Sequence, residues 1–184
     1  MLALFALTAL ATEPPAPPSP VAAQMHAHFA LITQARAALE KGDLTQARGH
    51  AQALVDLAPP EGLTDPWRPY MAELKSDAAS LAAATSPDAA ARQVAAIAIT
   101  CAACHQAKGG GPAIPAADTL DVSTDASKRD VGTDLLWLSL ITGSADAWKR
   151  GTALLEQPDA PAWGLIAADD DAARADAFAT LLTP

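Results

Sequence analysis

The residues whose types and spacing point most directly to chemistry are two cysteines and a histidine in the stretch Cys101-Ala-Ala-Cys104-His105. They comprise both cysteines of the chain and one of its four histidines. At this spacing two thiols can add to the two vinyl groups of a haem, and the adjacent imidazole can bind its iron. The motif therefore predicts covalently attached haem c, held by Cys101 and Cys104, with His105 as an iron ligand.

Three other interpretations of the same cluster fit less well but remain open. A thioredoxin-type dithiol lies at a helix N-terminus, where the thiol pKa is lowered, whereas this pair is expected near a helix C-terminus. A structural zinc site needs four ligands, and the chain offers no second cluster to supply the fourth. A disulfide across one helical turn has poor geometry.

A second iron ligand is expected from the apolar face of a helix predicted over residues 21–41. Met25 and His28 both lie on that face at helical spacing. We favour His28, with Met25 and an open coordination position as alternatives. Methionine ligation would raise the reduction potential relative to two histidines, and an open position would bind NO or CO. The weaker candidates are His26, His50 and Met71.

The elements that must position these residues are helices. Apolar residues make up 51% of the chain and aromatic residues 4%, and alanine, the strongest helix former, dominates. Four helices are predicted to begin near residues 21, 44, 66 and 87, with short connections. The sequence predicts an all-α fold in which residues 24–112 form an antiparallel four-helix bundle that binds the haem. A large apolar cofactor would supply core area that the small side chains lack.

The C-terminal part, residues 113–184, is predicted to be a helical extension packed on the bundle. Helices are expected at about 133–142, 145–157 and 169–182, after an irregular segment over 112–130. Tryptophans are the largest apolar side chains there and are expected to pack the added helices onto the bundle. They are Trp137, Trp148 and Trp163.

The N-terminal residues 1–23 are predicted to be a signal peptide followed by a linker. Residues 2–11 form an apolar run of signal-peptide length that is too short to span a bilayer. Small-residue cleavage patterns end at Ala11 and Ala23, although the positive region that usually precedes such a run is missing. Proline-rich residues 13–20 are typical of an extended linker. We therefore expect a periplasmic or exported protein, with a disordered apolar tail as the alternative.

The charge balance limits the classes of partner. The net charge is −9, which argues against nucleic acid and against strong association with anionic membranes once the signal is removed. It is compatible with docking onto basic redox partner proteins. The sequence has no nucleophile–base constellation, phosphate loop or pair of catalytic carboxylates, so we expect a protein that is not an enzyme.

Over residues 21–112 the chain resembles class II cytochromes c, the cytochrome c-prime-like type with four helices. The resemblance rests on the helix order and on Cys101, Cys104 and His105 at the end of the fourth helix. It implies that the cysteines carry the haem thioethers and that His105 is the proximal ligand. It also implies that a residue of the first helix, in the region 25–29, approaches the distal face. Because dimers are common in this family, a homodimer is a further expectation.

The chain as a whole is also similar to a set of bacterial cytochromes that have a similar C-terminal extension and carry a second haem-attachment motif near the C-terminus. The similar features are the histidine and phenylalanine at 28–29, the stretch at 42–44, Trp67, Tyr70 and the tryptophan-containing pattern over 136–155. This chain has no such second motif, which fits a version with one haem. We therefore expect a mono-haem electron-transfer protein, with a five-coordinate gas-binding cytochrome or a haem subunit of a larger respiratory or photosynthetic complex as alternatives.

Overall fold

The computed structural model describes residues 19–59, 64–156 and 168–183. Within these ranges all regular structure is helical, which confirms the predicted all-α class. The apolar run over residues 2–11, the cleavage pattern at Ala11, and Trp163 lie outside the described residues. The helices are α1 (Pro20–Glu40), α2 (Leu44–Asp56), α3 (Arg68–Ala82), α4 (Pro87–Lys108), α5 (Asp125–Thr142), α6 (Ala145–Leu155) and α7 (Asp171–Leu181), with short 3₁₀ turns at Asp65–Trp67 and Ala117–Thr119.

Most helices begin at a side chain that accepts a hydrogen bond from a backbone N–H of the first turn. Such caps satisfy donors that have no partner inside the helix, and each contributes about 1 kcal/mol. The caps predicted from the sequence at Asp43, Ser86 and Ser144 are confirmed. Proline follows the capping serine at the start of α1 and of α4, where its missing N–H costs nothing.

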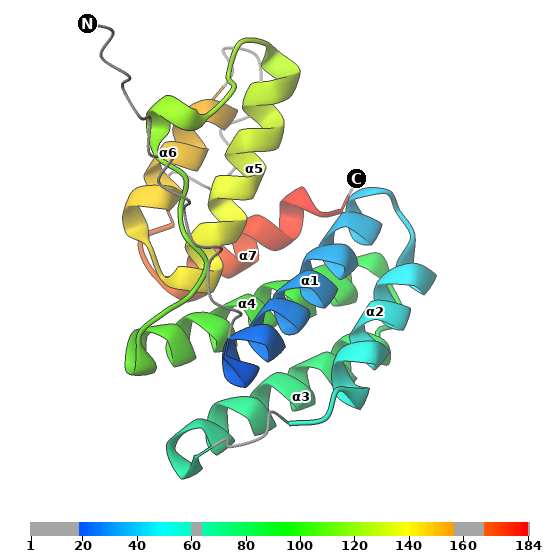
Figure 1. The fold of residues 1–184 in the computed structure, drawn as a ribbon. Coiled ribbons are helices and arrows are strands. Elements are labelled where there is room, and N and C mark those ends of the chain that lie inside the picture. Colours follow the sequence, from blue (N-terminus) through cyan, green and yellow to red (C-terminus); the bar gives the residue numbers. More distant parts are fainter. Residues whose placement is uncertain (1–18, 60–63, 157–167, 184) are drawn as a thin grey trace, which may run out of the picture.

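Helices α1 to α4 lie next to one another, and each contacts its neighbours in the chain. α1 also packs against α4, so the pairwise contacts close into a ring (Figure 1). The core of this part is made of alanine and aliphatic side chains, which lets the helices approach closely but fills little volume per residue. Its buried residues include Ile32, Ala35, Leu39, Ala51, Leu54, Leu74, Ala78, Leu81, Ala90, Val94, Ile97 and Ala98.

Helices α5 and α6 pack against each other on the other side of the molecule, and α7 lies between them and the first four helices (Figure 1). α5 and α6 cross at Gly132 and Gly151, where a β-carbon on Gly151 would lie 2.8 Å from the Gly132 carbonyl oxygen. Trp137 of α5 stacks on Phe178 of α7, with ring centroids 5.8 Å apart. Its indole nitrogen donates to Thr33 of α1 at 3.3 Å. Trp137 therefore packs the extension onto the first helices, as predicted.

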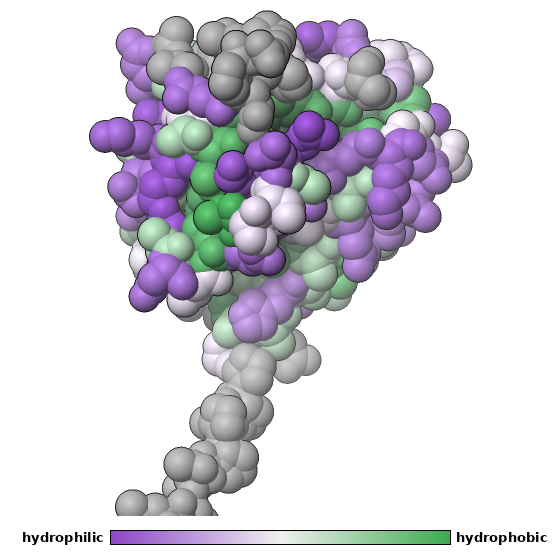
Figure 2. All heavy atoms as spheres, turned by 90° about the horizontal axis from the view of Figure 1, so that it is seen from above, coloured by the Kyte–Doolittle hydropathy of each residue, from purple (hydrophilic) through white to green (hydrophobic). Residues whose placement is uncertain are grey.

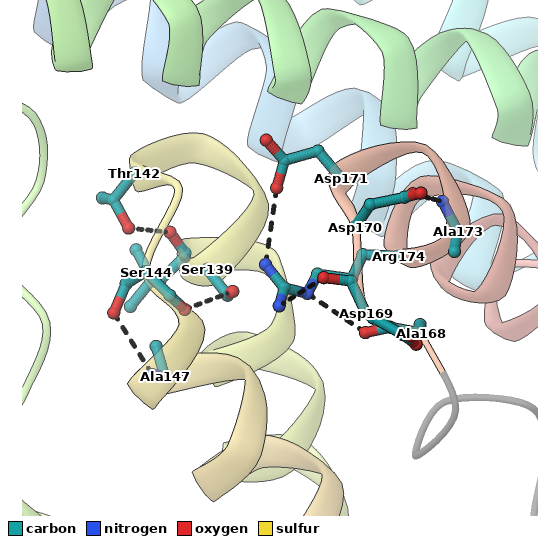
Figure 3. Close-up of polar contacts among 11 residues, drawn as sticks. Ser139, Thr142, Ser144, Ala147, Ala168, Asp169, Asp170, Asp171, Ala173 and Arg174 are labelled. Carbon is teal, nitrogen blue, oxygen red and sulfur yellow. Dashed lines mark hydrogen bonds and ion pairs between the residues drawn. The ribbon is translucent and has the colours of Figure 1, made fainter.

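Polar contacts organise the start of α7, which lies near the α5–α6 turn (Figure 3). Arg174 donates to the carbonyl oxygens of Ala168 and Asp169, and its guanidinium pairs with Asp171 at 3.4 Å. The same guanidinium lies 5.9 Å from the ring centroid of Trp148 on α6. One side chain thus organises the first turn of α7 and joins it to α6.

Two predicted boundaries were wrong. α5 begins at Asp125, whereas residues 112–130 were expected to be irregular. Its first turns are polar and carry no apolar period, but Thr124 and Ser127 form a reciprocal capping box that starts the helix there. The third helix was expected to open at Pro66, but Asp65–Trp67 form a 3₁₀ turn and α3 begins at Arg68.

The surface of the molecule is largely polar (Figure 2). Figure 2 shows hydrophilic side chains over most of the face seen from above, with a smaller hydrophobic patch between them. Among the large hydrophobic residues that the structure describes, Val122 is the one that is exposed to solvent. Within the same residues, no helix has both the length and the apolar character needed to span a membrane.

Candidate functional site

A cavity of about 500 Å³ lies at the end of the first four helices and is lined chiefly by α1, α3 and α4. Its size falls in the range of small-molecule and cofactor sites, roughly 300–1,000 Å³. All five site residues predicted from the sequence line it. They are Met25, His28, Cys101, Cys104 and His105.

The walls of the cavity are largely aliphatic and aromatic, which is typical of a site for a large apolar ligand. Of the weaker ligand candidates, Met71 and the exposed His26 also line the cavity, whereas His50 on α2 is not among its lining residues. The hydrophobic lining includes Val21, Phe29, Ile32, Trp67, Tyr70, Met71, Leu74 and Ile141.

The last two turns of α4 carry the two cysteines and His105. Positions 104 and 105 lie three and four residues after position 101, so all three side chains lie on the same side of the helix. Cys104 is buried, and Cys101 and His105 are half-buried. α4 ends just beyond them at Gly109, whose φ of 75° is open to glycine but rarely adopted by other residues. The motif therefore lines the cavity from the C-terminal end of α4.

The environment of the thiols does not suit redox catalysis. Burial raises the pKa of the Cys101 thiol to about 12, with smaller contributions from Cys104 and Asp77. Burial also raises the pKa of Cys104, which the positive charge of Lys108 opposes. Reactive dithiols have lowered thiol pKa values, so these two protonated thiols argue against a thioredoxin-type site.

The zinc and disulfide interpretations also lack support in the structure. Both cysteines are free thiols. In the part of the chain that the structure describes, no group of three or more His, Cys, Asp or Glu side chains is arranged to hold a metal ion. A structural zinc ion requires four such ligands. A haem iron requires only one or two ligands from the protein, because the macrocycle supplies the others.

His105 is oriented by a contact from α5. Its Nδ1 lies 2.8 Å from the carbonyl oxygen of Ile141. A carbonyl oxygen only accepts hydrogen bonds, so Nδ1 carries the proton in the neutral ring and Nε2 keeps its lone pair. Metal-binding histidines commonly donate their second ring nitrogen to such a carbonyl, which fixes the ring and increases its basicity. His105 is therefore prepared to bind a metal through Nε2.

His28 is the second histidine that fits an iron ligand. Its side chain is buried, with 4% of the residue exposed. Burial lowers the pKa of His28 to about 4, and the positive charge of Lys75 contributes, so the ring is neutral at neutral pH. Nδ1 is buried without a hydrogen-bond partner, and Nε2 lies 3.5 Å from the amide nitrogen of Gln24. An unpaired buried ring nitrogen costs about 1–3 kcal/mol, which ligation of a metal would offset.

Met25 lies one helical turn before His28 on α1 and lines the same cavity. It is half-buried, and a methionine in this position is also adequately explained by hydrophobic packing. The deeper burial of His28 and its unpaired nitrogen favour His28 over Met25 as the second ligand.

Two contributors to the site were not predicted. Ile141 was expected only as part of a C-terminal helix, and Gly111 only as part of the glycine run that ends α4. The carbonyl oxygen of Ile141 accepts a hydrogen bond from the imidazole of His105, and Gly111 lies against the same ring. The three consecutive glycines at 109–111 were a usable signal for a close approach of the backbone, whereas no local signal marks the contact with Ile141, 36 residues away.

Comparison with protein-family models, with curated proteins and with solved structures found no match for this chain. The chemical nature of the site is therefore argued from its own residues. Two thiols, one imidazole with a free Nε2 and a second buried neutral imidazole line one apolar cavity. This donor set fits a covalently attached haem and leaves no part of the motif unexplained.

Proposed function

We propose that the protein is a mono-haem c-type cytochrome that transfers electrons. The observation that carries this proposal is the convergence of the Cys101, Cys104 and His105 motif and His28 on one apolar cavity. These residues come from the end of α4 and the start of α1, about 75 positions apart in the sequence. Their spacing in the motif and their meeting in space are independent facts that point to the same group.

Each thiol has a definite role in the attachment. The S–H of Cys101 and that of Cys104 would each add across one vinyl group of a haem, forming a carbon–sulfur bond while the proton goes to the other vinyl carbon. The addition needs no oxidant and consumes both free thiols. The raised thiol pKa values and the burial of Cys104 keep these groups from competing reactions such as disulfide exchange.

The two histidines would hold the iron, His105 through Nε2 and His28 through a ring nitrogen. A bound haem supplies a one-electron couple between ferric and ferrous iron. The apolar walls, among them Phe29, Met71 and Leu74, exclude water from the surroundings of the metal, which is one of the means by which a protein sets a reduction potential. No group in the cavity is needed as a catalytic acid or base, so the protein would act on no substrate.

The wider context supports the same proposal. The ring of contacts among α1 to α4, with the motif at the end of α4, supports an antiparallel four-helix bundle of the class II cytochrome c type. The apolar run over residues 2–11 supports an exported or periplasmic protein. The net charge of −9 favours basic redox partner proteins.

The spectrum of the purified full chain tests the proposal. The ferric protein should be low-spin, should be reduced by one electron reversibly, and should show no spectral change with CO, because His28 would already bind the iron where CO would have to bind. A high-spin ferrous form that binds CO rapidly would indicate an open coordination site. The proposed function would then be gas binding and not electron transfer. A colourless protein, produced in a host that attaches haem c, would contradict both.

A further inference from the structure

The imidazole of His105 is enclosed by two backbone groups that lie outside the haem-attachment motif. One is the carbonyl of Ile141, near the C-terminus of α5, which lies 2.8 Å from Nδ1. The other is Gly111, three residues beyond the end of α4. Gly111 belongs to the irregular segment that follows α4, and Ile141 lies in the last turn of α5, the helix that this segment leads into.

The carbonyl of Ile141 lies where a helix has spare acceptors. The last carbonyls of a helix have no N–H partner four residues on, and the C-terminus carries a partial negative charge from the aligned peptide dipoles. α5 ends at Thr142, and Gly143 follows in a left-handed conformation with φ of 71°. The bond from His105 therefore gives an otherwise unpaired carbonyl of α5 a donor. It also places the imidazole N–H against the negative end of that helix.

Gly111 lets the chain pass close against the imidazole of His105. Its φ is +107°, which L side chains rarely adopt, and a β-carbon there would lie 3.1 Å from Nδ1 and 3.2 Å from Cγ of His105. Gly110 also has a positive φ, +98°, but a β-carbon on it would meet nothing within 4 Å. The close approach to His105 is thus specific to Gly111 and is not a general property of the glycine run.

We propose that the Ile141 carbonyl and Gly111 form a clamp that fixes the tautomer and the orientation of His105. The clamp holds the proton on Nδ1 and leaves Nε2 as the metal-binding atom. Both are positioning groups, since neither would contact the iron. The proposal rests on the proposed function for the identity of the metal, but the tautomer is a property of the polypeptide. It assigns a role to the C-terminal extension: α5 tunes a ligand that α4 carries.

The test follows the Nδ1 proton of His105 by NMR in the reduced, haem-loaded full chain, in Gly111→Ala and in Gly42→Ala. Gly42 is a matched control because its φ is +73° and a β-carbon on it would meet nothing within 4 Å. We expect a slowly exchanging Nδ1 proton in the unmodified protein and in Gly42→Ala. In Gly111→Ala the exchange should be about tenfold faster, which corresponds to the loss of one hydrogen bond, and the reduction potential should rise as the ligand becomes less basic.

Equal exchange rates and potentials in the two glycine variants would overturn the clamp. If Gly111→Ala fails to fold, the exchange of the Nδ1 proton in the unmodified protein decides the matter, because a rapidly exchanging proton contradicts the bond to Ile141. If the chain carries no haem, the proposed function fails, and the clamp is tested by the tautomer of His105 in the haem-free chain. A proton on Nδ1 would then support the clamp, and a proton on Nε2 would refute it.

Discussion

The two parts of the molecule are built from different side chains. The part made by α1 to α4 has a core of alanine and aliphatic residues and contains the cavity. The part made by α5 to α7 contains the two largest fully buried side chains among the described residues, Trp137 and Phe178. It contributes Ile141 to the lining of the cavity. Small core residues leave room for a group of several hundred cubic ångströms, whereas the large ones fill their own core. We infer that one part holds the haem and the other positions it.

The contacts that join the two parts differ in their consequences. His105 of α4 donates to Ile141 of α5. Arg36 of α1 pairs with Asp134 of α5 at 2.6 Å and lies 5.6 Å from the ring centroid of Trp137. The first contact touches the site, whereas the other two concern attachment of the extension. Variants of each should therefore separate effects on the haem from effects on stability.

The largest effect should come from removing both thiols. Cys101→Ala together with Cys104→Ala should abolish covalent haem completely, because no other cysteine exists in the chain. Haem staining of a denaturing gel measures this, and Ala103→Ser is the control, since Ala103 is exposed within the same motif. Haem that stays attached in the double variant would break the assignment of the site to α4.

The next effect concerns the second ligand. His28→Ala should convert the low-spin ferric protein into a high-spin form and allow the ferrous form to bind CO. His50→Ala should change neither property, because His50 does not line the cavity. Electronic and electron paramagnetic resonance spectra read the spin state. A low-spin spectrum that persists in His28→Ala would assign the ligand to another residue, with Met25 as the first to test.

The pH dependence of the stability of the haem-free chain offers a third test, which also concerns His28. The pKa of His28 is lowered from 6.5 to about 4 in the folded state, so the unfolded chain binds the extra proton first as the pH falls. The contribution of the neutral His28 to the free energy of unfolding is complete above pH 6.5. It declines by about 3 kcal/mol as the pH falls to 4. In His28→Leu this decline should be absent. Parallel pH profiles of urea unfolding for the two proteins would contradict the buried, neutral His28.

How much of this organisation was predictable depends on the range of each signal. The caps at Asp43 and Ser86 and the apolar period predicted α2 and α4 within a few residues, because both signals are local. The motif gave Cys101, Cys104 and His105 by spacing alone. The start of α5 was missed because its first turns are polar. The bond to Ile141 was missed because it depends on how α5 packs against α4, which no local pattern encodes.

A smaller effect is expected at the joint between α1 and α5. Asp134→Asn should lower the free energy of unfolding by about 1–2 kcal/mol, because the buried guanidinium of Arg36 loses an exposed charged partner and keeps its ion pair with Glu40. The exposed Asp176 of α7 provides a control as Asp176→Asn. Chemical denaturation measures both, and the visible spectrum should not move. A spectral shift in Asp134→Asn would show that this joint also acts on the site.

The smallest effect should come from the start of α5. Thr124→Ala removes the capping box and should cost about 1 kcal/mol, confined to the first turns of the helix. Hydrogen exchange of amides over residues 125–130 should quicken, while the Nδ1 proton of His105 at the other end of α5 should stay protected. Loss of protection at His105 would mean that α5 responds as one rigid unit, which would sharpen the division between the two parts.

The central claim is that α1 to α4 hold one covalently attached haem in the cavity between His28 and His105. Mass spectrometry of the denatured full chain, made in a bacterium that attaches haem c, tests this most directly when combined with a pyridine haemochrome spectrum. The account predicts a mass increase of one haem per chain, carried by the peptide with Cys101 and Cys104, and a c-type haemochrome. An unmodified mass with two free thiols would contradict it.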